Sequence, residues 1–407
     1  MAKSLSVRLH GKEVGILSLV DGKMEFLYNK GAENPISLSL PIQEAPFKEK
    51  ACRAFFGGLL PENPNMREVL AKKFNININD DFKLLEAIGH DCAGAISFHT
   101  LNEPINEDAI YKLSGTVLTS EDLKKLIEEL PYRPYMGKRL SLAGAQEKTA
   151  ICVYEDKFIL PDDNVPTTHI LKTALPKYIQ SIQNEYICMK AAKKIGLKVA
   201  NTEIKKIGDL EFLLVERFDR IVYDCSLNTD PKPAYERILQ EDFAQALGVQ
   251  SRDKYKITFK DCLKVLNQTQ APAVDKKEFV KQVIFNYLIG NTDAHGKNFS
   301  IYWFFNKINL TPAYDLLNSS IYDCDQRIAM KIGKAKYYAD VTTKDWELFA
   351  QDLDISPKVV FAELERQKRL LSTILENIVK EMDCEVGYMI LDYVTKIINN
   401  VYKRISK

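Results

Sequence analysis

The sequence predicts an α+β protein with two domains, the second of which is divided into two lobes. Its 407 residues are enough for two buried cores. Segments with strand-like alternation occur at the start of the chain and again between residues 140 and 215, whereas strongly periodic helical segments dominate after residue 277. Residues 131–138, which contain two prolines and a glycine, predict the connection between the domains.

The first domain, residues 1–132, is predicted to combine strands with helices. The predicted strands are residues 5–9, 13–20 and 24–28, with Asp21-Gly22 as a hairpin turn, and the predicted helices lie near residues 66–74 and 82–88. Thr119-Ser-Glu-Asp122 has the pattern of a capping box, in which two side chains satisfy backbone N–H groups of the first turn. A helix should therefore begin there and end before Pro131.

The second domain, residues 133–407, is predicted to have most of its strands first and its helices later. It begins with the apolar residues 140–153, which flank Ala143-Gly144-Ala145. The predicted strands are residues 169–173, 212–215, 299–305 and 308–310, and the predicted helices are residues 182–195, 277–289 and a long tail that opens at Ser356-Pro357. The first lobe would then cover about residues 133–218 and the second about residues 219–407.

Composition excludes several classes of protein. Hydrophobic residues make up 46% of the chain and charged residues 27%, and the net charge of +1 gives no argument for nucleic acid or an anionic membrane as the main partner. Eight cysteines without a C-x-x-C pair, no membrane-length apolar stretch and no signal-peptide core predict a reduced, cytoplasmic protein. No zinc site is predicted, because no other metal-ligating residue stands at a zinc-like spacing from His10, His90, His99 or His169.

The segment Asn291-Thr-Asp293-Ala-His295-Gly-Lys297-Asn298 carries the strongest chemical signal. Phosphoryl transfer needs an aspartate that orients the attacking hydroxyl and accepts its proton, oxygen ligands for Mg²⁺, and a lysine on the phosphates. In protein kinases four residues separate the catalytic aspartate from a metal-binding asparagine, and a second metal-binding aspartate follows a hairpin. Asp293 and Asn298 have this spacing, and Asp315 follows the predicted hairpin.

The same segment has a plainer interpretation as a polar turn at the end of a helix, because Asn, Asp and Gly are common turn residues. The hairpin and Asp315 stand in the order that a kinase requires, which favours the catalytic interpretation. His295 is then a positioning residue of this loop.

Lys172 closes the apolar strand His169-Ile-Leu-Lys172, where it is expected to bind ATP phosphates while Glu185 on the next helix orients it. Alternatively, Lys172 is a strand-end lysine that reaches solvent, and Glu185 is a carboxylate on the helix surface. The lysines between residues 190 and 206 predict a solvated face, with an acidic substrate or nucleic acid as the minor alternative.

Two further segments suit a nucleotide site. Ala143-Gly-Ala-Gln-Glu-Lys148 begins with small residues that let a backbone approach phosphates, although a tight turn has the same composition. Phe212-Leu-Leu-Val-Glu216-Arg-Phe218 suits a hinge at which adenine meets backbone groups and an aromatic edge. It is equally compatible with a buried strand end at which Arg217 forms a salt bridge.

In their order along the chain, these motifs resemble those of the HipA toxin kinases. The second domain contributes Ser141-Leu-Ala-Gly-Ala-Gln-Glu-Lys-Thr149, Pro166-Thr-Thr-His-Ile-Leu-Lys172, Asn184-Glu-Tyr186, Val215-Glu-Arg-Phe-Asp-Arg220, Gln240-Glu-Asp242, Leu288-Ile-Gly-Asn-Thr-Asp-Ala-His-Gly-Lys-Asn-Phe-Ser300 and Leu310-Thr-Pro-Ala-Tyr-Asp315. The first domain contributes Leu38-Ser-Leu-Pro41, Phe55-Phe-Gly-Gly-Leu-Leu-Pro61 and Ile88-Gly-His-Asp-Cys-Ala-Gly-Ala95. The departures are modest: Ala and Gly are exchanged around His295, which leaves every chemical group in place. The basic surface and C-terminal residues that would contact DNA or antitoxin do not match well enough to be transferred.

The resemblance implies a two-lobed protein-kinase-like domain preceded by a smaller α/β N-terminal domain. It implies Asp293 as the catalytic aspartate, Asn298 and Asp315 at Mg²⁺, and Ser141 as an autophosphorylation site that switches the kinase off. The ATP-binding residues that it implies are Ala143, Gly144, Ala145, Gln146, Glu147, Lys148, Lys172, Glu216, Arg217, Phe218, His295, Gly296, Lys297, Asn298, Tyr314 and Asp315.

The resemblance also implies partners. These are a HipB-like helix-turn-helix antitoxin, operator DNA bound through the complex with that antitoxin, and an aminoacyl-tRNA synthetase whose phosphorylation on serine arrests translation and growth, the state associated with persistence.

Two alternative functions stay open from the sequence. One is a kinase-shaped co-repressor with little catalytic role, and the other is a small-molecule phosphotransferase; intact Asp293, Asn298, Asp315 and Lys172 argue against the first.

Overall fold

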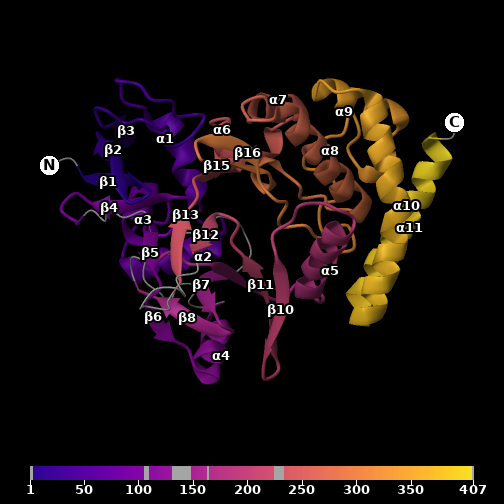
Figure 1. Cartoon of the computed structure of the whole chain (residues 1–407), viewed down its shortest axis with the longest axis horizontal. Helices are drawn as coiled ribbons and strands as arrows, with labels where there is room; N and C mark the ends of the chain where they lie inside the picture. The colour runs from indigo at the N-terminus through magenta and orange to yellow at the C-terminus, as the bar shows by residue number, and fades with distance from the viewer. Residues whose placement is uncertain (1–2, 105–109, 131–147, 163–164, 224–232, 406–407) are drawn as a thin grey trace. The chain divides into compact units, whose positions relative to one another are not determined.

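The computed structural model describes residues 3–104, 110–130, 148–162, 165–223 and 233–405. They form two compact units of mixed helix and sheet, which confirms the predicted α+β class (Figure 1). The first unit comprises residues 1–173, 205–251 and 302–306, and the second comprises residues 174–204, 252–301 and 307–407.

The first unit opens with an antiparallel sheet in the strand order β3-β2-β1-β4. Its strands are β1 (Ser4–Leu9), β2 (Lys12–Val20), β3 (Lys23–Tyr28) and β4 (Ile96–Thr100), and its helices are α1 (Glu49–Phe55), η1 (Gly57–Leu59), α2 (Pro64–Phe74) and α3 (Asp81–Ile88). The predicted hairpin is confirmed, because Asp21 and Gly22 have φ of 50° and 75°, as a two-residue turn between twisted strands requires. One apolar core, which includes Phe26, Phe56 and Phe98, joins the sheet to these helices.

A second sheet, which belongs to the first unit except for residues 202–204 of β10, has the order β10-β11-β9-β7-β8-β6. Its strands are β6 (Gly115–Val117), β7 (Lys148–Tyr154), β8 (Lys157–Pro161), β9 (His169–Thr173), β10 (Thr202–Ile207) and β11 (Leu210–Glu216). Helix α4 (Ser120–Glu129) packs Leu123 and Leu126 against Leu171 and Phe212 of this sheet. The predicted capping box is present, with the Asp122 N–H donating to Thr119 Oγ1 at 3.1 Å and the Thr119 N–H donating to the Asp122 carboxylate at 3.1 Å.

Several elements that precede the predicted domain boundary pair with segments that follow it. Strand β6 pairs with β8, and β5 (Ile110–Lys112) pairs with β13 (Ala234–Arg237), which also pairs with β12 (Arg220–Tyr223). The apolar face of α4 explains its placement, since its leucines are buried only when they meet the sheet. The short elements β14 (Gln240–Asp242) and α6 (Phe243–Ala246) complete the first unit.

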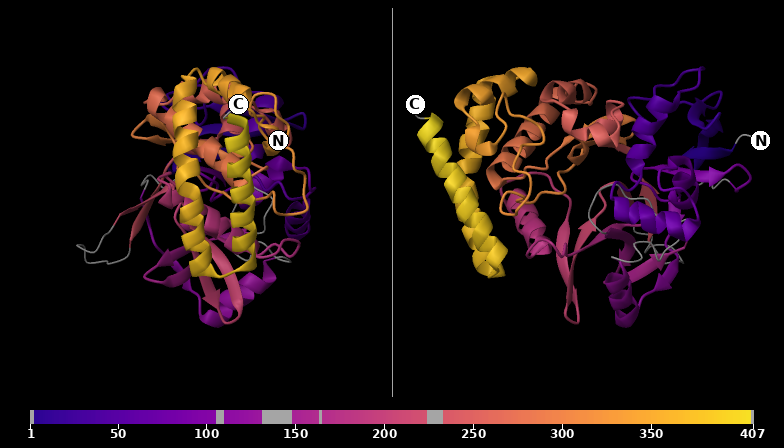
Figure 2. Two further views of the ribbon diagram at one scale, coloured as in Figure 1. Left: turned by 90° about the vertical axis from the view of Figure 1, so that its right-hand side faces the viewer. Right: turned by 180° about the vertical axis from the view of Figure 1, so that it is seen from behind.

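The second unit is mainly helical. Its elements are α5 (Ser181–Lys194), η2 (Ser251–Lys256), α7 (Phe259–Leu266), α8 (Pro272–Ile289), η3 (Gly296–Asn298), β16 (Lys307–Leu310), η4 (Tyr338–Asp340), α9 (Thr343–Asp352), α10 (Pro357–Met382) and α11 (Glu385–Ile405), and β15 (Ser300–Phe304) contributes residues to both units. Helix α8 begins five residues earlier than predicted, because Pro272 occupies its first turn, where its missing N–H costs no hydrogen bond. The helical tail consists of two helices that lie side by side (Figure 2). Among the described residues, no helix combines the length and the hydropathy that a membrane span requires.

Candidate active site

The candidate catalytic loop begins where α8 ends, at Gly290. This residue has φ of 76°, and its N–H caps the helix by donating to the carbonyls of Asn286 and Tyr287. A Cβ at this position would lie 2.4 Å from the Tyr393 ring, so glycine is required both for the backbone conformation and for space. The helix end therefore sets the starting point of the loop.

Buried hydrogen bonds hold the first residues of this loop. Asn291 Nδ2 donates to Asn286 Oδ1 at 2.8 Å, and Tyr338 Oη donates to the Asn291 carbonyl at 2.6 Å. The Thr292 N–H donates to Ser319 Oγ at 2.8 Å. Since these groups are buried, losing any of the bonds would leave an unsatisfied polar atom, and the loop geometry is correspondingly well defined.

Asp293 stands at the exposed tip of this scaffold. Tyr255 Oη donates to Asp293 Oδ1 at 2.8 Å, and the Tyr255 ring meets the His295 ring edge to face at 5.3 Å between centroids. Tyr255 belongs to η2, some forty residues upstream, and no sequence pattern pointed to it. The arrangement orients a carboxylate that remains accessible to a substrate hydroxyl, as a catalytic aspartate needs.

Asn298 and Asp315 come from opposite sides of the β15–β16 hairpin and are tied to the same loop. Asn298 Nδ2 donates to the Asp293 carbonyl at 3.3 Å, so the amide turns its nitrogen toward the loop and its oxygen away from it. The Asp315 carbonyl accepts from Asn291 Nδ2 at 3.4 Å, and Asp315 has φ of 58°, a left-handed conformation that aspartate adopts more readily than most residues. An amide oxygen and a carboxylate fit Mg²⁺, which prefers a few oxygen ligands from the protein.

The remaining predicted residues of this unit support the loop. A Cβ on Gly296 would lie 2.4 Å from Ile257 Cδ1, so glycine allows close packing there. Tyr314 Oη donates to the Lys297 carbonyl at 2.8 Å and contacts Ser300 Oγ at 2.6 Å. Gly296, Lys297 and Tyr314 therefore belong to the same local structure as Asp293.

Helix α5 fixes the segment that follows Asp315. Asn184 Nδ2 donates to the Asn318 carbonyl and the Asn318 N–H donates to Asn184 Oδ1, both at 2.8 Å, and Asn184 is fully buried. Glu185 is also buried, which speaks against the alternative of a surface carboxylate. Glu185 lies in the second unit, whereas Lys172, its predicted partner, lies in the first.

In the first unit, the predicted phosphate-binding lysines face each other across two strands. Lys148 on β7 pairs with Lys172 on β9, so both side chains lie on one face of the sheet, opposite the face covered by α4. Lys172 is buried and Lys148 is half-buried. Like charges directly opposite each other are unfavourable, and an anion bound beside them would offset this repulsion. Ser141 and the predicted loop Ala143, Gly144, Ala145, Gln146 and Glu147 lie outside the described residues.

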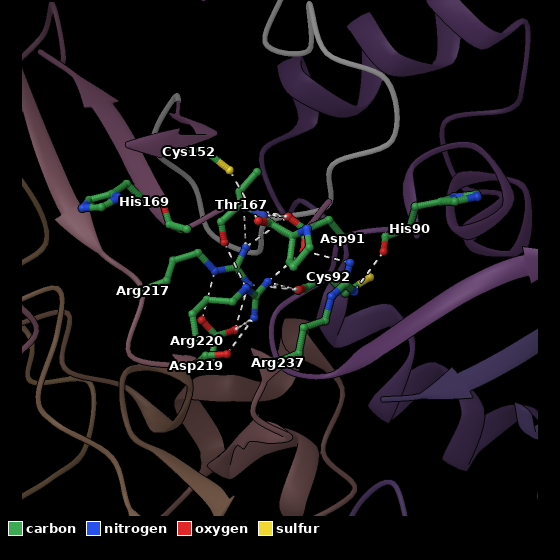
Figure 3. A network of polar contacts seen from close by, with 12 residues as sticks. His90, Asp91, Cys92, Cys152, Thr167, His169, Arg217, Asp219, Arg220 and Arg237 are labelled. Atoms are coloured by element: carbon green, nitrogen blue, oxygen red, sulfur yellow. Dashed lines mark hydrogen bonds and ion pairs between the residues drawn. The ribbon is translucent and has the colours of Figure 1, made fainter. Parts of the chain in front are cut away.

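The predicted hinge lies at the end of β11, where Glu216 is exposed and Phe218 is half-buried. The side chain of Arg217 enters a buried network of charges (Figure 3). Its Nε and Nη2 donate to Asp219 at 3.0 and 2.8 Å, and its Nη1 donates to Thr167 Oγ1 at 2.9 Å. The backbone N–H of Arg217 donates to the Thr168 carbonyl at 2.9 Å. Since the side chain and the N–H of Arg217 are both engaged, this residue can contact a nucleotide only through its carbonyl oxygen.

Asp91, from the predicted N-terminal domain, is the second acid of this network. It accepts from Arg220 at 2.7 Å and lies 3.4 Å from Arg217 and 3.5 Å from Arg237 (Figure 3). Burial by itself would raise the pKa of Asp91, but the three guanidinium groups overcome burial and hold it below its ordinary value. The network thereby fastens the hinge strand to the N-terminal part of the chain.

Asp91→Asn is expected to destabilise the protein by about 3 to 5 kcal/mol, because it leaves three buried arginines facing the single carboxylate of Asp219. Urea titration of the full chain measures this loss. Glu25→Gln is the matched control, since the Glu25–Lys48 pair of the same unit is exposed and should contribute less than about 1 kcal/mol. Equal losses in the two variants would show that the network does not stabilise the hinge.

The ion pairs of Asp91 also predict how the stability of the fold depends on pH. Because the pKa of Asp91 in the folded chain lies below the ordinary value of 3.8, its ion pairs stabilise the fold above about pH 4, and this contribution is lost as the pH falls through the folded-state pKa. The stability of Asp91→Asn should therefore vary less with pH in this acidic range than that of the unmodified chain.

Two protein-family models match this chain. The family model of the HipA-like C-terminal domain matches residues 140–385, and that of the HipA N-terminal domain matches residues 5–99. The chain is 38% identical over 337 residues to the protein Y4mE of Sinorhizobium fredii, across 80% of this chain and 78% of that protein. It is 30% identical over 321 residues to the serine/threonine-protein kinase toxin HipA of Shewanella oneidensis, across 73% and 70% of the two chains.

The fold of this chain is also similar to that of a solved HipA structure. A chain from the complex of Shewanella oneidensis HipA and HipB with operator DNA superposes with a TM-score of 0.82 at 25% identity, covering 98% of this chain and 97% of that one. Elements β5, β6 and α4 lie between the two regions that the family models match. Both models match in the order that the sequence predicts, and the chain therefore belongs to the HipA family of kinases.

Proposed function

We propose that this chain is a serine/threonine-protein kinase toxin that transfers the γ-phosphoryl group of ATP to a serine of an aminoacyl-tRNA synthetase in the cytoplasm, and so inhibits translation and growth. The observation that carries the proposal is the loop on which Asp293 and Asn298 are held together, with Asp315 hydrogen-bonded to the same loop through Asn291. This is the arrangement that in-line phosphoryl transfer to a hydroxyl requires.

In the proposed reaction Asp293 acts as the catalytic aspartate. Its carboxylate, oriented by Tyr255, accepts the proton of the substrate serine while the serine oxygen forms a bond to the γ-phosphorus. The bond between the γ-phosphorus and the bridging oxygen breaks, and ADP leaves with that oxygen. Lys148 and Lys172 are the proposed phosphate-binding lysines. The residues at the end of β11, together with residues 143–147, are the other proposed ATP-binding residues.

Asn298 and Asp315 would hold Mg²⁺ through their side-chain oxygens. When bound, the ion neutralises the charge on the transferred phosphoryl group and on the leaving oxygen. The amide orientation of Asn298, whose nitrogen donates to the Asp293 carbonyl, leaves its oxygen available as such a ligand.

The direct test is incubation of the purified chain with Mg-ATP and a panel of purified aminoacyl-tRNA synthetases. We expect one synthetase to gain a phosphoserine, detected by peptide mass spectrometry, and to lose its charging activity. Transfer to no protein at all would overturn the kinase assignment, whereas transfer to a serine of an unrelated protein would overturn only the choice of substrate.

We further propose a HipB-like helix-turn-helix antitoxin as partner. Its support is the relative that was solved with HipB and operator DNA. Co-expression with the product of an adjacent helix-turn-helix gene should give a stable complex that retards the operator fragment on a gel. A chain that forms this complex yet transfers no phosphate would instead be a co-repressor.

Incubation with Mg-ATP is expected to phosphorylate Ser141 and to lower nucleotide affinity. A phosphoserine adds about −1.5 to −2 charges at neutral pH, which would repel the ATP phosphates from the neighbouring loop and compete for its amides and Lys172. Intact-mass and peptide mass spectrometry test the modification, and nucleotide titration of the modified protein tests the loss of affinity. Ser141→Ala should retain nucleotide binding after the same treatment. A Ser141 that stays unmodified while the substrate is phosphorylated would contradict the proposed off-switch.

A further inference from the structure

Two histidines and a glutamate that are scattered in the sequence meet in the first unit. His90 follows α3, His99 lies on β4, and Glu103 lies in the turn after β4. The distance from Glu103 Oε1 to His99 Nδ1 is 2.8 Å and that to His90 Nε2 is 3.3 Å, and the three atoms lie within 4.8 Å of one another. Both histidines are buried and the glutamate is half-buried.

The two separations that involve Glu103 approach those of a zinc site, and the ligand atoms of the two histidines lie within 4.8 Å of each other. Ligand atoms bound tetrahedrally to zinc at roughly 2.0–2.1 Å lie about 3.4 Å from one another. The His90–Glu103 distance already has this value. The His99–Glu103 distance must open by about half an ångström, a change within reach of the half-buried Glu103 side chain.

We propose that His90, His99 and Glu103 bind a divalent transition-metal ion of the zinc class, with water as the fourth ligand. Two imidazoles and one carboxylate suit zinc, whereas Mg²⁺ and Ca²⁺ prefer oxygen ligands alone. The site is distinct from the proposed Mg²⁺ site, because its three ligands belong to the first unit and those of the Mg²⁺ site to the second.

The surroundings of His99 resemble the outer shell of a metal site. His99 Nε2 lies 2.9 Å from Ser97 Oγ, which can accept its N–H and so leave Nδ1 as the ligand atom. The backbone carbonyl of His90 accepts from Arg237 at 3.0 Å. The imidazole ring of His90 points away from the arginines of the charge network (Figure 3).

Nearby positive charges repel a bound cation and so limit the affinity of this site for zinc. Arg8 donates to the carbonyls of Glu103 and Pro104 at 2.6 and 2.8 Å, and Arg237 stands beside His90. The carboxylate of Glu103 offsets one of these charges. Bound metal would fasten the turn after β4 to the residue that precedes Asp91, and thus to the buried charge network.

The test uses the full chain, stripped with EDTA and titrated with ZnCl₂ by calorimetry, with bound metal counted by mass spectrometry. We expect one equivalent of zinc, and tetrahedral visible absorption when Co²⁺ replaces it. Ser97→Ala removes an outer-shell partner and should weaken zinc binding by roughly 10- to 100-fold. His99→Gln and Glu103→Gln each remove a ligand and should weaken zinc binding by at least as much. His169→Gln is the control, because that histidine lies outside the cluster.

Failure of the unmodified chain to bind zinc, or Co²⁺ absorption without tetrahedral character, would overturn the proposal, and neither observation depends on a variant that folds poorly. Zinc that remains bound in both His99→Gln and Glu103→Gln would also overturn it. The melting temperature should rise with zinc in the unmodified chain and in His169→Gln but not in Glu103→Gln. None of these measurements requires kinase activity, so they succeed or fail independently of the proposed function.

Discussion

Asp293→Asn is expected to lower the rate of phosphoryl transfer by about 10²- to 10⁴-fold while the fold and ATP binding persist. The amide keeps the shape of the side chain and can still contact Tyr255, but it cannot accept the proton of the attacking serine. Transfer from radiolabelled ATP to the protein substrate measures the rate, and calorimetry measures nucleotide affinity. Because the carboxylate is exposed, its replacement leaves no buried charge unpaired.

Asp392→Asn is the matched control. Asp392 is an exposed acid on α11 of the same unit, paired with Lys396 at 2.6 Å, and its loss should leave the transfer rate unchanged. Transfer by Asp293→Asn at the rate of the unmodified chain would remove Asp293 from its proposed role. Tyr255→Phe should retain part of the activity, since it removes the orienting hydroxyl and leaves the base in place.

Asp315→Ala is expected to weaken Mg-ATP binding and to reduce transfer by about 10²-fold or more, because a bound metal ion is worth several kcal/mol in a phosphoryl-transfer transition state. ATP titrations with and without Mg²⁺ separate the Mg²⁺-dependent part of the ATP affinity from the part that does not need the ion. Only the Mg²⁺-dependent part of the ATP affinity should disappear.

The backbone at Asp315 calls for a second variant. Alanine is disfavoured at φ of 58°, whereas asparagine adopts this conformation readily. Asp315→Asn therefore keeps the backbone relaxed while it removes the negative charge. If Asp315→Asn binds Mg-ATP as well as the unmodified chain and only Asp315→Ala fails, backbone strain and not a lost metal ligand explains the effect.

Much of the local structure could be predicted from the sequence. The strand over residues 169–173 has the predicted limits, Thr119 caps α4 as its pattern requires, and Gly290 ends α8. Each of these features depends on residues that lie within a few positions of one another, where propensity and capping act directly. The α1, α7 and α9 helices and the strand partners of β6 were not predicted, because their apolar faces become informative only when the opposing surface is known.

The sequence by itself determined the class of this protein and the order of its chemical groups. Asp293, Asn298 and Asp315 can be recognised along the chain because phosphoryl transfer constrains their spacing on one loop and one hairpin. The tertiary structure alone decided that Tyr255 orients Asp293, that Arg217 meets Asp91 across 126 positions, and that His90 and His99 share a glutamate. Arg217, Asp91, His90 and His99 are buried, and buried charges and rings are stable only beside partners that the fold supplies. Tyr255 and Asp293 are exposed, and they meet because the fold brings η2 beside the loop. None of these partners stands at a fixed spacing in the sequence.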